Sequence, residues 1–207
     1  MDPKYSKDIY GDEDAYYMGC PEIVSKHLAQ RLSDFDSAIE LCCGAGMICV
    51  QLAKEIDEVI GVDIRERRVK NAEKNAKLYD VSENTNFLVG DATDEKLLKK
   101  LSAEVVVLEP DWSSPGSKKN DHASKLKSTQ PCSDKLFKLT KRHITENIVF
   151  RAPKTFSTKT LGRLGPCKIE NIYWNNELKF KIVYYFPDLE ETTEEDIHFD
   201  PKELLEE

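Results

Sequence analysis

Short runs of consecutive apolar residues alternate along this chain with segments in which apolar residues recur every three or four positions. Unbroken apolar runs are typical of central parallel strands covered on both faces. The runs predict strands at 38–42, 59–62, 86–91, 104–112 and 147–153. The recurring pattern predicts helices that begin near Pro21, after Gly46 and near Val69.

The C-terminal part of the chain shows a different pattern. Residues 169–186 form two strand-like stretches around Asn175 and Asn176, which predicts an antiparallel hairpin. Alternating strands and helices followed by a hairpin indicate an α/β, Rossmann-like fold. We expect seven strands in a mostly parallel sheet, a helical lead-in over 1–19, a main domain over 20–190 and an acidic tail over 191–207. The tail is expected to be mobile beyond Thr192.

Composition narrows the class of protein. The chain has 207 residues, of which 40% are hydrophobic and 33% charged, as expected of one soluble domain. No apolar run approaches the roughly 20 residues that span a bilayer. The N-terminus has no apolar segment typical of a secretion signal. We therefore expect an intracellular monomer, nuclear if the source is eukaryotic and otherwise cytoplasmic, with no membrane partner.

Cysteine and histidine spacing gives no metal motif. There is no Cys-x-x-Cys pair, and the four histidines are scattered. Cys42, Cys43 and Cys49 are interpreted as small apolar residues of a buried strand and helix. We predict no metal site.

Charge is unevenly distributed, although the net charge is −8. Residues 118–168 contain 13 Lys and Arg against three acidic residues, whereas residues 169–207 contain 12 acidic and three basic residues. A basic middle on an acidic chain is compatible with a local RNA-binding face. The same lysines are equally compatible with a solvated loop and helix.

A glycine turn follows the first predicted strand. Gly44 and Gly46 lie where the strand must turn sharply and its backbone can approach a ligand, and Asp63 ends the next strand 17 residues after Gly46. In dinucleotide-binding folds this combination places a carboxylate on ribose hydroxyls. The turn has no third glycine and no Gly-Lys-Ser/Thr sequence. An adenosine without phosphate therefore fits better than a pyrophosphate.

Four strand ends are expected to converge, because ligands of open α/β sheets bind beyond the carboxyl ends of the strands. The turn at 44–46 would support the amino-acid part of an adenosyl ligand, and Asp63 would accept from the ribose. Asp91 and the backbone of Ala92 would meet the adenine amine. Residues 109–112 would lie where the substrate enters. Each acidic residue taken alone is also compatible with a capping or turn role.

This arrangement resembles the class I S-adenosylmethionine-dependent methyltransferases. The sequence EPDWSSPG, at 109–116, is similar to the Ser-Pro-Pro-Trp-Gly-Gly-Pro loop of the trimethylguanosine synthases, which dimethylate the exocyclic amine of a 7-methylguanosine RNA cap. The lead-in DEDAYYMGCPEIVSKHLAQRL and the hairpin LGPCKIENIYWNNELKFKIVYYFPDL also resemble that family. The resemblance covers residues 12–189.

The loop departs from the family at several positions. Asp111 replaces the second proline, Glu109 replaces the leading Ser or Asp, and Ser113 and Ser114 replace two glycines. Glu40 stands in for the family's Asp. These changes alter the stiffness and charge of the loop.

The resemblance implies S-adenosyl-L-methionine as cofactor and capped RNA as partner. The implied catalytic residues are Glu109, Pro110 and Trp112. Trp112 would stack on the 7-methylguanine, whose positive charge is attracted to an indole face. The implied substrate-binding residues are Tyr16, Tyr17, Asp111 and Trp112. The implied cofactor-binding residues are Pro21, Glu22, Glu40, Cys42, Gly44, Gly46, Asp63, Ile64, Asp91, Ala92 and Glu109.

Three hypotheses for function remain open. The first is an RNA cap guanine methyltransferase that makes 2,2,7-trimethylguanosine, with catalysis mainly by positioning the amine and no obligatory general base. The second is a methyltransferase for a guanine amine in another RNA. The third is a pseudoenzyme that serves as a binding module in an RNA-processing assembly.

Overall fold

The computed structural model describes residues 4–112, 123–200 and 202. The chain forms two compact units. Unit 1 comprises residues 1–92, 103–105 and 200–207, and unit 2 comprises residues 93–102 and 106–199.

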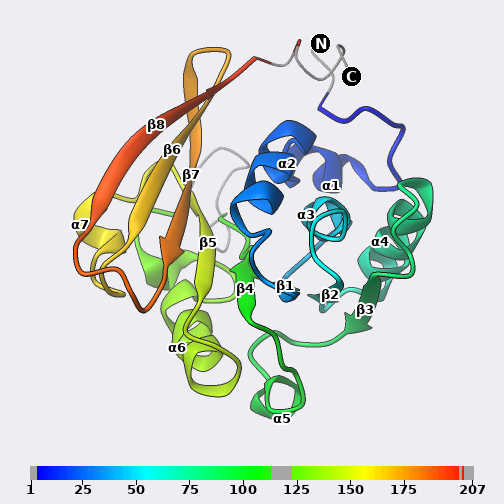
Figure 1. Cartoon of the computed structure of the whole chain (residues 1–207), viewed down its shortest axis with the longest axis horizontal. Helices are drawn as coiled ribbons and strands as arrows, with labels where there is room; N and C mark the ends of the chain where they lie inside the picture. The colour runs from blue at the N-terminus through cyan, green and yellow to red at the C-terminus, as the bar shows by residue number, and fades with distance from the viewer. Residues whose placement is uncertain (1–3, 113–122, 201, 203–207) are drawn as a thin grey trace. The chain divides into compact units, whose positions relative to one another are not determined.

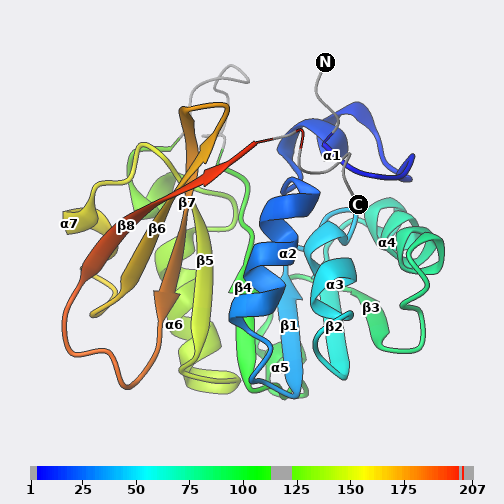
Figure 2. The same ribbon diagram turned by 45° about the horizontal axis from the view of Figure 1, so that its top comes forward.

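Unit 1 contains three parallel strands in the order β3-β2-β1 (Figure 1). The strands are β1 (Ser37–Leu41), β2 (Glu58–Asp63) and β3 (Thr85–Val89). The helices are α1 (Glu13–Met18), α2 (Glu22–Arg31), α3 (Met47–Leu52) and α4 (Glu66–Leu78). All six residues of α3 are buried, whereas α4 buries one face. The helices α2 and α3 lie side by side in both views (Figures 1 and 2).

Unit 2 has strands in the order β4-β5-β7-β6-β8. These are β4 (Val105–Leu108), β5 (Ile148–Pro153), β6 (Lys168–Trp174), β7 (Glu177–Tyr185) and β8 (Thr193–Phe199). β4 and β5 are parallel, β7 is antiparallel to both β5 and β6, and β8 runs parallel to β6. The helices are α5 (Glu95–Leu98), η1 (Leu126–Ser128), α6 (Ser133–His143) and α7 (Thr158–Leu161).

The predicted fold class is confirmed, with alternating strands and helices followed by antiparallel C-terminal strands. The hairpin turns where it was expected, because Asn175 and Asn176 both adopt left-handed backbone angles, φ 52° and 59°. Two consecutive residues with positive φ match the twist of a two-residue hairpin, and asparagine tolerates this conformation well. Among the described helices, none is long and apolar enough to cross a membrane.

The predicted count of seven strands is wrong, because residues 193–199 form an eighth strand where the sequence indicated a mobile tail. The acidic side chains of β8 have partners on β6 and β7. Glu194 accepts from Lys181 Nζ at 2.8 Å, and Glu195 lies 2.8 Å from Lys168 Nζ. These cross-strand pairs offset the low strand preference of acidic residues. The pairs join residues distant in sequence, so a local pattern could not reveal them.

Candidate functional site

The two glycines of the turn after β1 have different surroundings. Cys42, Gly44 and Gly46 all have positive φ, which turns the chain from β1 into α3. Apart from its two chain neighbours, no atom of the described residues lies within 4 Å of where a Gly44 Cβ would be, so the backbone there borders open space. A Cβ on Gly46 would lie 2.7 Å from Ala72 Cβ and 3.0 Å from Phe87 Cε1. Gly44 thus leaves room for a ligand, whereas Gly46 allows close packing of α3.

Asp63 holds the shape of this turn. Its side chain is buried, Oδ2 accepts from Gly44 N at 2.9 Å, and Oδ1 accepts from Arg65 N at 2.9 Å. The guanidinium of Arg68 lies 4.0 Å from Oδ2. A carboxylate oxygen can accept a second hydrogen bond. The contact between Asp63 and ribose hydroxyls stays a prediction, and the structure adds that the carboxylate is fixed in position.

The residues beside Asp63 have the character that an adenosine requires. Ile64 exposes 65% of its surface, which is unusual for a large apolar residue. Gly90 N donates to Asp63 O at 3.0 Å, which ties the end of β3 to the end of β2. Exposed Asp91 and buried Ala92 follow directly. An exposed apolar side chain, a fixed carboxylate and an open glycine backbone together fit an adenosyl cofactor.

Glu40 is occupied within unit 1. It is 2% exposed, and its Oε2 accepts from Cys49 N at 2.9 Å and from Cys49 Sγ at 2.8 Å. Burial raises the pKa of Cys49 well above its usual value, so the thiol is the donor. Glu40 therefore connects β1 to α3, and any contact with a cofactor stays a prediction.

Glu22 lies at a junction of three segments. It is 1% exposed and accepts from Ser6 N at 2.7 Å and from Tyr79 OH at 2.9 Å, while Lys26 Nζ lies 3.7 Å away. Pro21 is the N-cap residue of the same helix. The structure thus places both predicted residues where the N-terminal segment meets α2 and α4. Their role in shaping a cofactor pocket is a prediction.

Asn75 is a residue that the sequence reasoning missed. It is fully buried on α4, and its Nδ2 donates to Ala45 O and to Tyr10 O, both at 2.9 Å. Tyr10 N donates back to Asn75 Oδ1 at 2.7 Å. Asn75 therefore connects the glycine turn to the N-terminal segment. The available signal was an asparagine within the apolar stripe of a helix, where a polar residue needs partners.

Tyr16 and Tyr17 lie on α1 and are 44% and 59% exposed. The ring of Tyr16 packs edge-on against Tyr5 with centroids 5.5 Å apart. Lys4 Nζ donates to the carbonyl oxygens of Tyr16 at 2.8 Å and Tyr17 at 3.1 Å. The segment is therefore anchored by its backbone and one ring, while both tyrosines keep substantial exposed surface for a ligand.

In unit 2, the predicted substrate loop begins directly after β4. Asp111 forms an antiparallel bridge with Gln130, with N···O distances of 2.7 and 2.9 Å, and Trp112 O accepts from Ala123 N at 2.7 Å. Pro110 is buried, whereas Asp111 and Trp112 are partly exposed. Ser113 and Ser114, with the rest of the predicted loop, lie outside the described residues.

Arg151 on β5 organises this loop, and the sequence reasoning missed it. Its Nε lies 2.8 and 2.6 Å from the two carboxylate oxygens of Glu109, and both side chains are largely buried. Burial raises the pKa of Glu109, and the Arg151 guanidinium opposes that shift. The Arg151 Cζ lies 4.6 Å from the centroid of Trp112, whose Nε1 donates to Arg151 O at 3.0 Å.

One face of Trp112 thus already carries a cation, and the Glu109 carboxylate is used in an ion pair. Phe180 also packs near the indole, with ring centroids 5.9 Å apart. The signal that could have identified the pair was a charged residue inside the apolar strand at 147–153. Such a residue is almost always paired.

The basic stretch and the cysteines give weaker indications. Several cations of residues 118–168 have acidic neighbours, including Lys138 with Asp134 at 3.1 Å and Lys154 with Glu177 at 3.5 Å. Both interpretations of that stretch therefore stay open. All six cysteines are free thiols, and the described residues contain no group of three or more His, Cys, Asp or Glu arranged to hold a metal.

Known proteins resemble this chain at the level of both sequence and fold. An uncharacterized RNA methyltransferase of Enterococcus faecalis is 38% identical over 84 residues, which cover 38% of this chain and 18% of that protein. The tRNA (uracil(54)-C(5))-methyltransferase of Saccharomyces cerevisiae is 40% identical over 76 residues, covering 35% of this chain and 11% of that protein. The chain matches less than a fifth of the length of either relative.

Two solved structures share the fold. A putative methyltransferase from Porphyromonas gingivalis superposes with a TM-score of 0.68 at 11% identity, over 86% of this chain and 43% of that one. An RNA methyltransferase from Salinibacter ruber, in complex with S-adenosyl-L-homocysteine, gives a TM-score of 0.51 at 21% identity, over 84% of this chain and 94% of that one. The model of the family described as RNA cap guanine-N2 methyltransferase matches residues 35–188. Because that match spans the glycine turn, the substrate loop and the hairpin, the chain belongs to the RNA cap guanine-N2 methyltransferase family.

Proposed function

We propose that this protein methylates the exocyclic N2 amine of the 7-methylguanosine cap of RNA to give 2,2,7-trimethylguanosine. The family match supports the coarser part of this proposal, namely that the protein is an S-adenosyl-L-methionine-dependent RNA methyltransferase. The observation that carries the finer proposal is the family match over 35–188, which includes both the turn at 44–46 and the loop at 109–112.

The residues of unit 1 would hold the cofactor. When bound, S-adenosyl-L-methionine supplies a methyl group activated by its sulfonium. The open backbone at Gly44 would lie against the amino-acid part, and Asp63 would accept from the ribose hydroxyls. The exposed Ile64 side chain would cover the adenine ring, and Asp91 with Ala92 would meet its amine. Backbone N–H groups already fix Asp63, so little ordering of that carboxylate is required on binding.

The loop of unit 2 would hold the base. Backbone carbonyls around Pro110 would orient the exocyclic amine while the indole of Trp112 stacks on the ring. Catalysis would consist mainly of holding the amine nitrogen in line with the activated methyl group, and its proton would leave to solvent after transfer. The Glu109 carboxylate, paired with Arg151, is not assigned the role of a general base in this mechanism.

One observation favours a second candidate, namely a guanine amine in an RNA without a 7-methyl group. The guanidinium of Arg151 lies over one face of Trp112, and a cation there weakens the attraction of the same indole for a positively charged base. A neutral guanine does not experience this penalty. The pair Glu109 and Arg151 therefore bears directly on which guanine is the substrate.

Methyl transfer from labelled cofactor tests the proposal. Matched RNAs would carry a 7-methylguanosine cap, an unmethylated guanosine cap or a 5′-triphosphate, and digestion with mass spectrometry would locate the methyl groups. Transfer to N2 of the 7-methylated cap alone supports the cap assignment, whereas equal transfer to both caps supports the second candidate. Binding of capped RNA without transfer would instead identify a binding module.

A further inference from the structure

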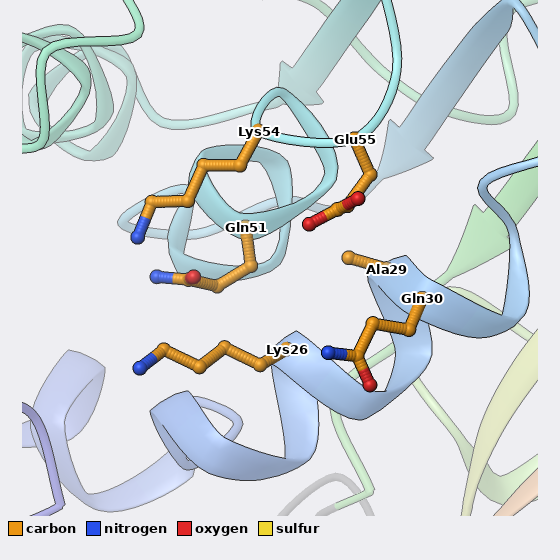
Figure 3. A pocket seen from close by; sticks show the side chains of 6 residues that line it. All are labelled: Lys26, Ala29, Gln30, Gln51, Lys54 and Glu55. Atoms are coloured by element: carbon orange, nitrogen blue, oxygen red, sulfur yellow. The ribbon is translucent and has the colours of Figure 1, made fainter. Parts of the chain in front are cut away.

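A polar hollow of about 200 Å³ lies in unit 1 between α2 and the end of α3 (Figure 3). It is lined by Lys26, Ala29, Gln30, Gln51, Lys54 and Glu55. Lys26, Ala29 and Gln30 follow the i, i+3, i+4 spacing that places side chains on one face of α2. Gln51 lies at the end of α3, and Lys54 and Glu55 lie in the turn that follows it. Two polar faces therefore meet here, and the small side chain of Ala29 leaves the space open.

Gln51 is the unusual residue of this hollow. It is 1% exposed, and neither its Oε1 nor its Nε2 has a hydrogen-bond partner among the described residues. The other five residues of α3 are apolar or cysteine, so a leucine or methionine would fill this position without a buried polar group. Because buried carboxamides are almost always hydrogen-bonded, Gln51 indicates a partner other than the described residues.

Two positive charges lie beside this carboxamide. Figure 3 shows the side chains of Lys26 and Lys54 extending on either side of Gln51, with their ammonium groups toward the same end. Lys26 Nζ lies 3.7 Å from Glu22, and Lys54 Nζ lies 5.1 Å from the ring centroid of Tyr79. These contacts orient the ammonium groups, each of which has three N–H donors.

The other end of the hollow has the opposite character. Glu55 and Gln30 lie there, and the carboxylate of Glu55 points into the space above Ala29 (Figure 3). A carboxylate and a carboxamide accept hydrogen bonds from hydroxyl groups. The hollow therefore offers donors for an anion at one end and acceptors for hydroxyls at the other.

We propose that this hollow binds one phosphate and ribose unit of the RNA substrate. Phosphate oxygens would accept from Lys26, Lys54 and Gln51 Nε2, and a ribose hydroxyl would donate to Gln51 Oε1 or Glu55. The volume is smaller than a typical pocket for a drug-sized ligand, which suits a single backbone unit. The proposal rests on the RNA methyltransferase assignment. Such a contact strengthens binding of the substrate and the transition state equally.

Two variants with a matched control test the site. In Lys26→Gln/Lys54→Gln, KM for a long capped RNA should rise about tenfold with kcat unchanged, because only uniform binding is lost. KM for a cap dinucleotide should stay at the wild-type value. The slope of the logarithm of RNA affinity against the logarithm of salt concentration should become shallower by about 0.7 per lost phosphate contact. Lys96→Gln/Lys99→Gln, on α5 and at its C-cap, removes the same charge elsewhere and should leave the KM for long RNA unchanged.

Gln51→Leu separates ligand binding from a structural role. It should raise the melting temperature, because it removes an unpaired buried carboxamide, and it should weaken binding of long RNA about three- to tenfold. Wild-type RNA affinity in both Gln51→Leu and the double lysine variant would overturn the proposal. The proposal would also be overturned if these variants abolished binding of inorganic phosphate but left RNA affinity unchanged. The ligand would then be a free phosphate.

The measurement of RNA binding keeps this inference distinct from the proposed activity. If the wild-type protein transfers no methyl group to any cap, the proposed function fails. Direct titration of RNA against wild type and the variants still decides whether the hollow binds the strand.

Discussion

Two carboxylates are held in place by different means: that of Asp63, beside the turn at 44–46 in unit 1, and that of Glu109, in the loop at 109–112 in unit 2. Asp63 accepts from two backbone N–H groups, at Gly44 and Arg65. Glu109 is held by the side chain of Arg151. Backbone donors persist whatever side chains surround them, whereas Glu109 depends on one residue. The position of Asp63 therefore depends less on neighbouring side chains than that of Glu109 does.

The same contrast appears in the resemblance to the family. The glycine turn keeps the features shared by class I methyltransferases, while the loop replaces Ser-Pro-Pro-Trp by Glu-Pro-Asp-Trp. The added charge at Glu109 is balanced by Arg151, which also contacts Trp112. The carboxylate that the altered loop introduces at Glu109 is therefore paired rather than buried alone.

Removing Arg151 should produce the largest effect. Arg151→Leu leaves the Glu109 carboxylate buried without its partner and should destabilise the protein by about 3–5 kcal/mol. In Glu109→Ser/Arg151→Leu most of this loss should be recovered, because no unpaired charge remains. Denaturant unfolding of both variants checks this. If both lose the same stability, Arg151 acts through its packing and not through the ion pair.

Asp63→Ala should have the next largest effect, on the cofactor region alone. It removes the predicted acceptor for two ribose hydroxyls and the support of the turn at Gly44, which should weaken cofactor binding by about 2–3 kcal/mol. Calorimetry with S-adenosylhomocysteine measures this. Asp57→Ala, an exposed residue before β2, is the control. Wild-type affinity in folded Asp63→Ala would contradict the assignment.

Trp112→Ala should weaken binding of the 7-methylguanosine cap by about 1–2 kcal/mol while cofactor affinity stays nearly unchanged. Trp112→Phe should bind the cap with an affinity between those of the wild type and Trp112→Ala, because phenylalanine keeps a flat face with weaker attraction for a cation. In Glu109→Ser/Arg151→Leu the preference for the 7-methylated cap should increase, since the competing guanidinium is gone. Titration with methylated and unmethylated cap dinucleotides measures both effects. Equal affinity for the two caps in every variant would exclude recognition of the positive charge.

The smallest effect is expected from the basic stretch at 118–168. If its lysines contact RNA, affinity for a capped oligonucleotide should fall more steeply with salt than affinity for a cap dinucleotide. The slope of log affinity against log salt concentration should differ by about 0.7 per phosphate contact. Lys138 and Lys141 already lie near acidic residues, which limits their contribution. Filter binding between low and moderate salt tests this. Equal slopes for the two ligands would show that these lysines form only a solvated surface.

Local signals predicted much of this molecule. Apolar runs identified the parallel strands, and Asn175 with Asn176 identified the hairpin turn, because each of these features depends on neighbouring residues. Asn75, Arg151 and the eighth strand were missed, since each depends on partners distant in sequence. The role of Gly46 was also only partly predicted, because its contact with Ala72 exists only after α3 packs on α4.

The acidic strand β8 has a consequence for how copies of this protein behave in concentrated solution. It is the last strand of its sheet, so the backbone groups along its outer side are a template on which another strand could pair. Glu194, Glu195 and Asp196 follow one another along that edge. A second molecule approaching with the same strand would bring like charges into register. The segment that the sequence pattern presented as a tail therefore gives the open edge of this sheet a charged strand, and charged edge strands disfavour edge-to-edge pairing.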